Sequence, residues 1–158
     1  MPSVNCVCDR KTHHRRAEID FPENFARFLI ERTETTIAVA SEVILNLAEE
    51  SGQQLAERCG GNSLEHLSNG TGQWAAGGAL KRDVLEKTNS KYNYNIVRCK
   101  YAEMYKELGL EELGFIFSCG RDGKMFGGFN PNIKFERTQT IMQGADYCDF
   151  RLSLEVAD

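Results

Sequence analysis

The sequence predicts an α+β fold, with N-terminal helices packed on a mainly antiparallel sheet formed largely by the C-terminal half. Two observations predict this class: apolar residues at helical spacing in the first third of the chain, and strand-like alternation in the last third. Helices that come first and strands that follow are typical of α+β proteins. With 158 residues, we expect a basic, flexible segment over 1–20 and one domain with its own core over 21–158.

The helical part of the chain is expected to begin after a start signal at 20–23, where an acidic residue and a proline stand together. A long helix is predicted over 24–50, and the Ser-Gly pair at 51–52 either ends it or only interrupts it. Residues 60–78 are rich in Gly, Asn and Ser and are expected to form a loop with one short helical turn. A second helix is predicted from 74 or 75 to 88.

The strand signal begins at 92–97, where Tyr and Ile alternate with Asn and Val. A helix is then predicted over 98–108, with one apolar face directed at the core; this face comprises Tyr101, Met104, Tyr105 and Leu108. Three further strands are expected over 114–119, 132–142 and 147–156.

Charge and cysteine content exclude several classes of function. A net charge of −4 argues against general nucleic-acid binding, and the basic run 10–16 is interpreted as part of a solvated tail. No apolar run is long enough for a membrane span or a secretory signal. Six irregularly spaced cysteines suit a reducing compartment, so a cytoplasmic location is expected.

Two short motifs give weak signals, one for nucleotide binding and one for metal binding. Residues 70–75 match a relaxed dinucleotide fingerprint, but no strand precedes them, so a loop beside a small-ligand pocket is the better interpretation. Cys6, Cys8, His13 and His14 could ligate a metal, although their spacing is not the regular paired spacing that zinc prefers.

Cys99 is the strongest candidate for a reactive thiol. It is predicted to lie in the first turn of the 98–108 helix, away from that helix's apolar face. Free N–H groups at a helix N-terminus stabilise a thiolate, and Arg98 adds a positive charge beside it. The alternative is a small side chain packed on the sheet.

Cys119 and Asp122 lie where the predicted 114–119 strand opens into a glycine-containing loop, a frequent place for functional side chains. Asp122 could orient a base or substrate, or simply form the Asp-Gly turn. Cys148 falls on the apolar face of the last strand and is expected to be buried. Asp149 and Arg151 point to its polar face, as a surface ion pair or as a site for a charged substrate.

Several sequence blocks together resemble the L-2-amino-thiazoline-4-carboxylic acid hydrolase family. The resemblance extends over about 90–152, and from 25 to 89 it is only general. The blocks occur in a specific order and spacing: 95–109, 112–122, 129–131, 137–140 and 144–151.

The resemblance implies a small enzyme that opens a five-membered cyclic amidine or imidate bearing a carboxylate, by attack of water at the C=N carbon and cleavage of a non-peptide C–N bond. From the chemistry, we expect Cys119 or Cys99 to attack and Asp122 or Asp149 to handle protons. We expect Arg137 or Arg151 to bind the substrate carboxylate, with Arg98 and Cys148 completing the substrate-binding set. No histidine falls in these blocks, and His66 is the only one outside the tail.

Two other functions stay open at this point. Cys99, Cys119 and Cys148 could together hold a metal or an iron–sulfur cluster, although no cofactor is the first expectation. The same fold could instead be a non-catalytic module that binds a small molecule. Expected partners are a small-molecule substrate, neither nucleic acid nor membrane, and a second copy of the chain, because a meander sheet leaves an edge strand exposed.

Overall fold

A computed structural model describes the backbone of residues 23–154 and the side chains of residues 31–154. The chain divides into residues 1–35 and 36–158, and the sheet, the core and the cavity described below all belong to the second part. The basic N-terminal segment, with Cys6, Cys8, His13 and His14, lies outside the described residues. No helix in the described part is both long enough and apolar enough to cross a membrane.

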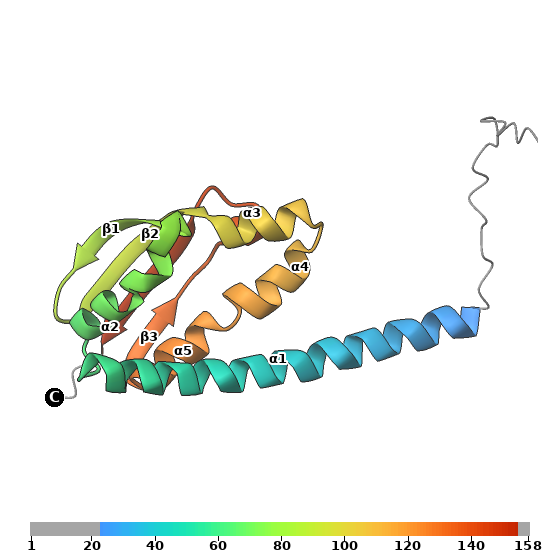
Figure 1. Cartoon of the computed structure of the whole chain (residues 1–158), viewed down its shortest axis with the longest axis horizontal. Helices are drawn as coiled ribbons and strands as arrows, with labels where there is room; N and C mark the ends of the chain where they lie inside the picture. Colours follow the sequence, from blue (N-terminus) through green and yellow to red (C-terminus); the bar gives the residue numbers. More distant parts are fainter. Residues whose placement is uncertain (1–22, 155–158) are drawn as a thin grey trace, which may run out of the picture. The chain divides into compact units, whose positions relative to one another are not determined.

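One four-stranded antiparallel sheet organises the fold (Figure 1), and it confirms the predicted α+β class. The strand order is β1-β2-β4-β3, so β1 and β3 are the edges. The strands are β1 (Leu80–Lys87), β2 (Lys91–Cys99), β3 (Ile133–Glu136) and β4 (Cys148–Leu154). Because β2 is antiparallel to both neighbours, its last residues lie beside the first residues of β1 and β4.

The helical elements comprise five α-helices and three shorter turns within the described residues. The α-helices are α1 (Glu23–Cys59), α2 (Leu64–Gly70), α3 (Lys100–Glu107), α4 (Glu111–Gly114) and α5 (Asp122–Phe129). The shorter turns are the 3₁₀ segments η1 (Thr71–Gly78) and η3 (Ile141–Gln143) and the π-helical turn η2 (Phe115–Cys119).

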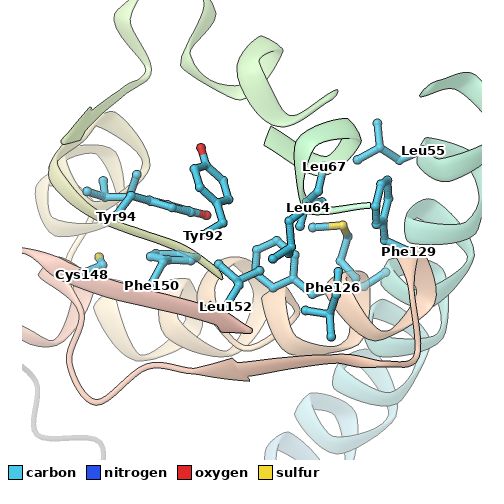
Figure 2. Packing of buried hydrophobic residues seen from close by; sticks show 14 residues of the cluster. Leu55, Leu64, Leu67, Tyr92, Tyr94, Phe126, Phe129, Cys148, Phe150 and Leu152 are labelled. Atoms are coloured by element: carbon cyan, nitrogen blue, oxygen red, sulfur yellow. The ribbon is translucent and has the colours of Figure 1, made fainter. Parts of the chain in front are cut away.

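The core lies between one face of the sheet and α1, α2 and α5 (Figure 2). As predicted, Tyr92, Tyr94 and Ile96 alternate along β2 and are buried. Tyr94 stacks on Phe150 of β4 with ring centroids 4.8 Å apart, and the edge of Phe126 from α5 meets Phe150 at 6.3 Å. Such aromatic contacts fix the sheet against α5.

The helix α1 continues through the Ser51-Gly52 pair, so this pair neither ends nor interrupts it. A glycine is required there because a Cβ on Gly52 would collide with the backbone of α5. Reciprocally, a Cβ on Gly128 of α5 would collide with the backbone of Glu49. These two glycines let α1 and α5 approach closely enough to exclude side chains at their crossing.

The predicted helix over 74–88 is wrong. Its first part is η1, and its second part is the edge strand β1. Gly77 and Gly78 have φ angles of +62° and +70°, which separate the two elements. Residues that favour a helix weakly then pair with β2, because tertiary pairing overrides a weak local preference. In addition, the loop predicted over 60–78 contains α2 as well as η1.

Two predicted strands are also corrected. Residues 114–119 form the end of α4 and the turn η2, not a strand, because a short apolar run does not distinguish the two conformations. The strand expected over 132–142 is limited to β3, followed by an extended loop and η3. Cys119 therefore ends a helical turn, and Asp122 begins α5 instead of forming the Asp-Gly turn.

The predicted core face of the 98–108 helix is wrong as well. The helix itself is present as α3 and ends at Gly109, whose φ is +66°. However, Tyr101, Met104 and Leu108 are exposed, whereas Ala102 is buried. The apolar spacing thus predicted the helix correctly but not the face that it buries.

Candidate active site

A cavity of about 320 Å³ lies where the end of β2, the starts of β1 and β4, and the turn η2 meet. Its apolar wall includes Trp74, Leu80, Ile96, Met125 and Phe150. The polar and nucleophilic groups in the wall are Arg82, Tyr94, Cys99, Tyr101, Ser118, Cys119, Arg121, Asp122, Arg137 and Cys148. A mostly apolar pocket with a few convergent polar groups is the usual form of a small-molecule site.

Cys99 is the N-cap residue of α3 and lies at the end of β2. Its Sγ accepts a hydrogen bond of 3.5 Å from the backbone N–H of Ala102. Burial raises the pKa of the Cys99 thiol, while the backbone N–H groups of Ala102 and Tyr101 oppose this rise. The predicted position at the start of the helix is confirmed, one residue before the first helical turn. The expectation that this position and Arg98 make Cys99 a stronger acid is wrong, because burial outweighs the N–H groups and Arg98 pairs with Glu103.

Cys148 lies opposite Ile96 at the start of β4 and is 6% exposed. Its Sγ accepts a hydrogen bond of 3.2 Å from the N–H of Ile141, the first residue of η3. Burial raises its pKa, and the Ile141 amide partly offsets this. As predicted, Cys148 is a buried side chain (Figure 2), and it helps to hold η3 against the sheet.

Cys119 is the last residue of η2. Burial, followed by the negative charge of Asp122, raises the pKa of the Cys119 thiol to about 12, although the Arg137 cation lowers it. This thiol is therefore neutral near pH 7. The three thiols differ in the hydrogen bonds that their sulfur atoms accept, but the carboxylate of Asp122 raises the pKa of each of them.

Asp122 and Arg137 form the main ion pair of the cavity wall. Arg137 Nη1 lies 2.6 Å from Asp122 Oδ2, and Arg137 Nη2 donates to the carbonyl of Cys119 at 2.9 Å. The guanidinium also lies 5.5 Å and 5.2 Å from the ring centroids of Phe135 and Phe150. Burial raises the pKa of Asp122 to about 6, although Arg137 opposes the rise.

Arg82 also lines the cavity, although it is not among the residues predicted from the sequence. It follows a register irregularity of β1 between Lys81 and Arg82, and such bulges re-aim side chains beside functional sites. The residue lies in a segment that was predicted as helix. No signal in the sequence separates it from the chain's other arginines.

Three predicted site residues lie outside the cavity wall. Asp149 accepts hydrogen bonds from the backbone and hydroxyl of Thr138 and from the backbone of Gln139, at 2.8–3.2 Å. Arg151 donates to the backbone carbonyls of Tyr94 and Phe150 and to the side chain of Asn95. Arg98 is exposed and pairs with Glu103 at 2.7 Å, so its charge is neutralised by a neighbour.

Of the remaining motifs, His66 lies away from this wall, whereas the run 70–75 contributes Trp74 to it, in agreement with the prediction that this run borders a small-ligand pocket. His66 Nδ1 lies 2.7 Å from Ser63 Oγ at the start of α2. The glycine-containing run 70–75 passes from α2 into η1 without a preceding strand, which the dinucleotide fingerprint would need. Within the described residues, no group of three or more His, Cys, Asp or Glu side chains is arranged to hold a metal ion.

Comparison with known families decides the broader assignment. The sequence profile of the family described as L-2-amino-thiazoline-4-carboxylic acid hydrolase matches residues 14–152. The chain belongs to this hydrolase family. A search of curated proteins found no matching relative. The matched region contains every residue of the cavity wall, so the family relationship covers the whole site.

Membership in the L-2-amino-thiazoline-4-carboxylic acid hydrolase family confirms the resemblance inferred from the sequence blocks. It extends that resemblance from residues 90–152 to almost the entire chain. The family description concerns a small ring that carries a carboxylic acid, and the cavity is of the size and composition that small molecules occupy. Within the family, the chemistry of this chain depends on the residues of its own cavity.

Proposed function

We propose that this protein hydrolyses a small cyclic amidine bearing a carboxylate, of the 2-aminothiazoline-carboxylate type, by opening a ring C–N bond. The observation that carries the proposal is the position of Asp122, whose carboxylate lies in the wall of a largely apolar cavity lined by three thiols. A carboxylate with a pKa of about 6 can both accept and donate a proton near neutral pH. That property is what ring opening requires.

The reaction needs two proton transfers: one from the group that attacks the amidine carbon, and one to the ring nitrogen that leaves it. The amidine carbon becomes electrophilic when the ring is protonated, and the ring nitrogen leaves only as a protonated amine. Asp122 takes the proton from the attacking group and delivers it to the ring nitrogen as the C–N bond breaks. Arg137 holds the Asp122 carboxylate through the 2.6 Å contact, so this group stays oriented between successive transfers.

We propose Cys99 as the attacking nucleophile. Burial and Asp122 raise the pKa of both thiols, but two backbone N–H groups at the start of α3 oppose this rise at Cys99, whereas the pKa of Cys119 reaches about 12. Sulfur bonds to the amidine carbon, and the thiol proton passes to Asp122 and then to the departing ring nitrogen. Water, deprotonated by Asp122, then attacks the same carbon and displaces the Cys99 sulfur, which recovers the proton.

The test is a set of single serine substitutions assayed with L-2-aminothiazoline-4-carboxylate. We expect C99S to lose roughly 1000-fold or more in kcat, because a neutral serine hydroxyl is a far weaker nucleophile. C119S and C148S should retain most turnover. Cys59, which lies outside the cavity wall, provides the matched control C59S.

Other outcomes assign the chemistry differently. Loss of activity in C119S alone would make Cys119 the nucleophile and would refute our assignment of Cys99. Full activity in all four variants would exclude a thiol nucleophile and leave direct attack by water with Asp122 as base. Elemental analysis of the active protein tests the metal alternative, since turnover that follows a stoichiometric metal content would contradict a purely organic mechanism.

A further inference from the structure

Arg82 is a cavity-lining guanidinium that has no anionic partner among the described residues. Its buried Nε is also the single buried side-chain nitrogen or oxygen in the described part of the chain without a hydrogen-bond partner. Buried polar groups are usually satisfied, and an uncompensated cation beside an apolar cavity is costly. This arrangement indicates that an anion completes the site.

The orientation of Arg82 is fixed before any ligand binds. Its Nη1 donates to the hydroxyl of Tyr92 at 2.6 Å, and its Nη2 donates to the carbonyl and hydroxyl of Thr71 at 3.3 and 3.4 Å. The guanidinium carbon also lies 4.6 Å from the ring centroid of Tyr94. All of these partners are neutral, so they position the cation without neutralising it.

Arg137 differs from Arg82 in this respect. Its charge is matched by Asp122, and its second Nη donates to the carbonyl of Cys119. An incoming carboxylate at Arg137 would have to compete with Asp122 and would meet like charge. The third arginine of the wall, Arg121, is exposed, so water can solvate its charge. Of the three cavity arginines, Arg82 is therefore the best site for an anion.

The cavity wall thus presents groups of opposite charge to a ligand: Arg82, which has no anionic partner, and the Asp122 carboxylate, which Arg137 holds in place. Asp122 suits the cationic amidinium end of a ring, and Arg82 suits an anionic end. Both charges act on Tyr94. Burial raises the pKa of its hydroxyl, the Arg82 cation opposes this rise, and the Asp122 anion adds to it. A molecule that carries both charges on one small ring can satisfy both groups at once.

We propose that Arg82 binds the carboxylate of the substrate and thereby makes the cavity selective for zwitterionic rings. This inference rests on the proposed hydrolase function and adds a specificity-determining residue to it. The Nε–H of Arg82 is the donor left for a carboxylate, and a charge-assisted hydrogen bond from this held guanidinium orients the ring as well as raising its affinity. With the carboxylate at Arg82, the amidinium faces the half of the wall that contains Asp122.

The test compares two rings, L-2-aminothiazoline-4-carboxylate and 2-aminothiazoline, which lacks the carboxylate. We expect R82M to lower kcat/KM for the carboxylated ring by roughly 100-fold, mainly through KM, because a charge-assisted contact is lost. The reaction of the analogue without a carboxylate should change little. R82K keeps the charge but not the planar fork, so it should fall between the wild type and R82M.

Lys81→Met is the matched control, since it removes the same charge from the neighbouring, exposed residue of β1. If R82M slows both rings equally, Arg82 has only a structural role and the proposal is refuted. If R82M does not fold, R82K and Y92F provide the same comparison. Y92F removes the hydroxyl that orients Arg82, so it should weaken discrimination between the two rings.

A binding measurement separates failure of this inference from failure of the proposed function. If the wild type turns over neither ring, the hydrolase proposal fails, but calorimetry can still compare the two rings as ligands. Stronger wild-type binding of the carboxylated ring, abolished in R82M, would support the role of Arg82 by itself. Equal binding of both rings to the wild type would refute it.

Discussion

Two aspartates of this protein lie in contrasting surroundings. Asp122 lies in the cavity wall at the start of α5, and burial raises its pKa to about 6 despite its contact with Arg137. Asp149 lies on β4 outside that wall. Its burial raises the pKa, but hydrogen bonds from the Thr138 side chain and the Gln139 and Thr138 amides outweigh this, and its pKa is lowered.

This difference in pKa distinguishes a carboxylate that can take part in the reaction from one that stabilises the fold. A lowered pKa means that the fold stabilises the charged form, as expected of a carboxylate that holds a loop in place. A raised pKa means that the fold tolerates the charge at a cost, which is common at catalytic sites. Asp149 holds the loop that follows Arg137, so it supports the site indirectly, whereas Asp122 is positioned to react.

Of the two aspartate variants, Asp122→Asn is expected to have the larger effect on activity. The amide cannot transfer the proton, so kcat/KM for L-2-aminothiazoline-4-carboxylate should fall by about 1000-fold, within the range typical of a lost general acid–base. The fold should remain, because a raised pKa shows that these surroundings favour a neutral side chain. Steady-state kinetics and thermal unfolding of the same preparation measure both quantities. Retained activity would remove Asp122 from the mechanism.

Asp149→Asn should show the opposite pattern. Replacing the charged acceptor of several hydrogen bonds should lower the free energy of unfolding by about 2 kcal/mol. Activity per folded molecule should change far less than in D122N, because Asp149 does not line the cavity. Urea unfolding followed by fluorescence tests this, with the exposed Asp146→Asn as control. A large loss of kcat with unchanged stability would place Asp149 in the reaction instead.

The sequence predicted the central strands but not the edge strand. In β2 and β4, alternating apolar residues face the core, so the period-two signal was strong. The strand β1 is an edge strand, and its apolar residues Val84 and Leu85 are adjacent and exposed, so no alternation marked it. Its identity depends on pairing with β2, a contact that local sequence does not encode.

The same limit applies to the site. Cys99, Cys119, Asp122, Arg137 and Cys148 were all singled out from sequence, and the structure brings them to one cavity. Arg82 was missed because it lies on the strand mistaken for a helix. Strand alternation correctly predicts that Asp149 and Arg151 face away from Cys148, but it does not predict what meets that face. Asp149 supports a loop and Arg151 bonds to β2, so neither side chain reaches the cavity wall.

The pH dependence gives the smallest but most specific test of the difference between the two aspartates. If ionised Asp122 accepts the first proton, kcat/KM should fall about tenfold per pH unit below pH 6, where this carboxylate becomes protonated. Asp149 stays ionised over this range because its pKa is lowered below its ordinary value of 3.8. Its contribution to stability is therefore present above pH 3.8 and is lost only as pH falls through its folded-state pKa.

Protonation of Asp122 has the opposite effect on folding. Since its folded-state pKa is raised above the ordinary 3.8, protonation between pH 6 and 4 favours the folded state. The acid loss of activity should therefore occur in protein that remains folded, as circular dichroism at pH 5 can verify. A loss of activity that coincides with unfolding, or one that has its midpoint near pH 4, would show that Asp122 does not control the reaction.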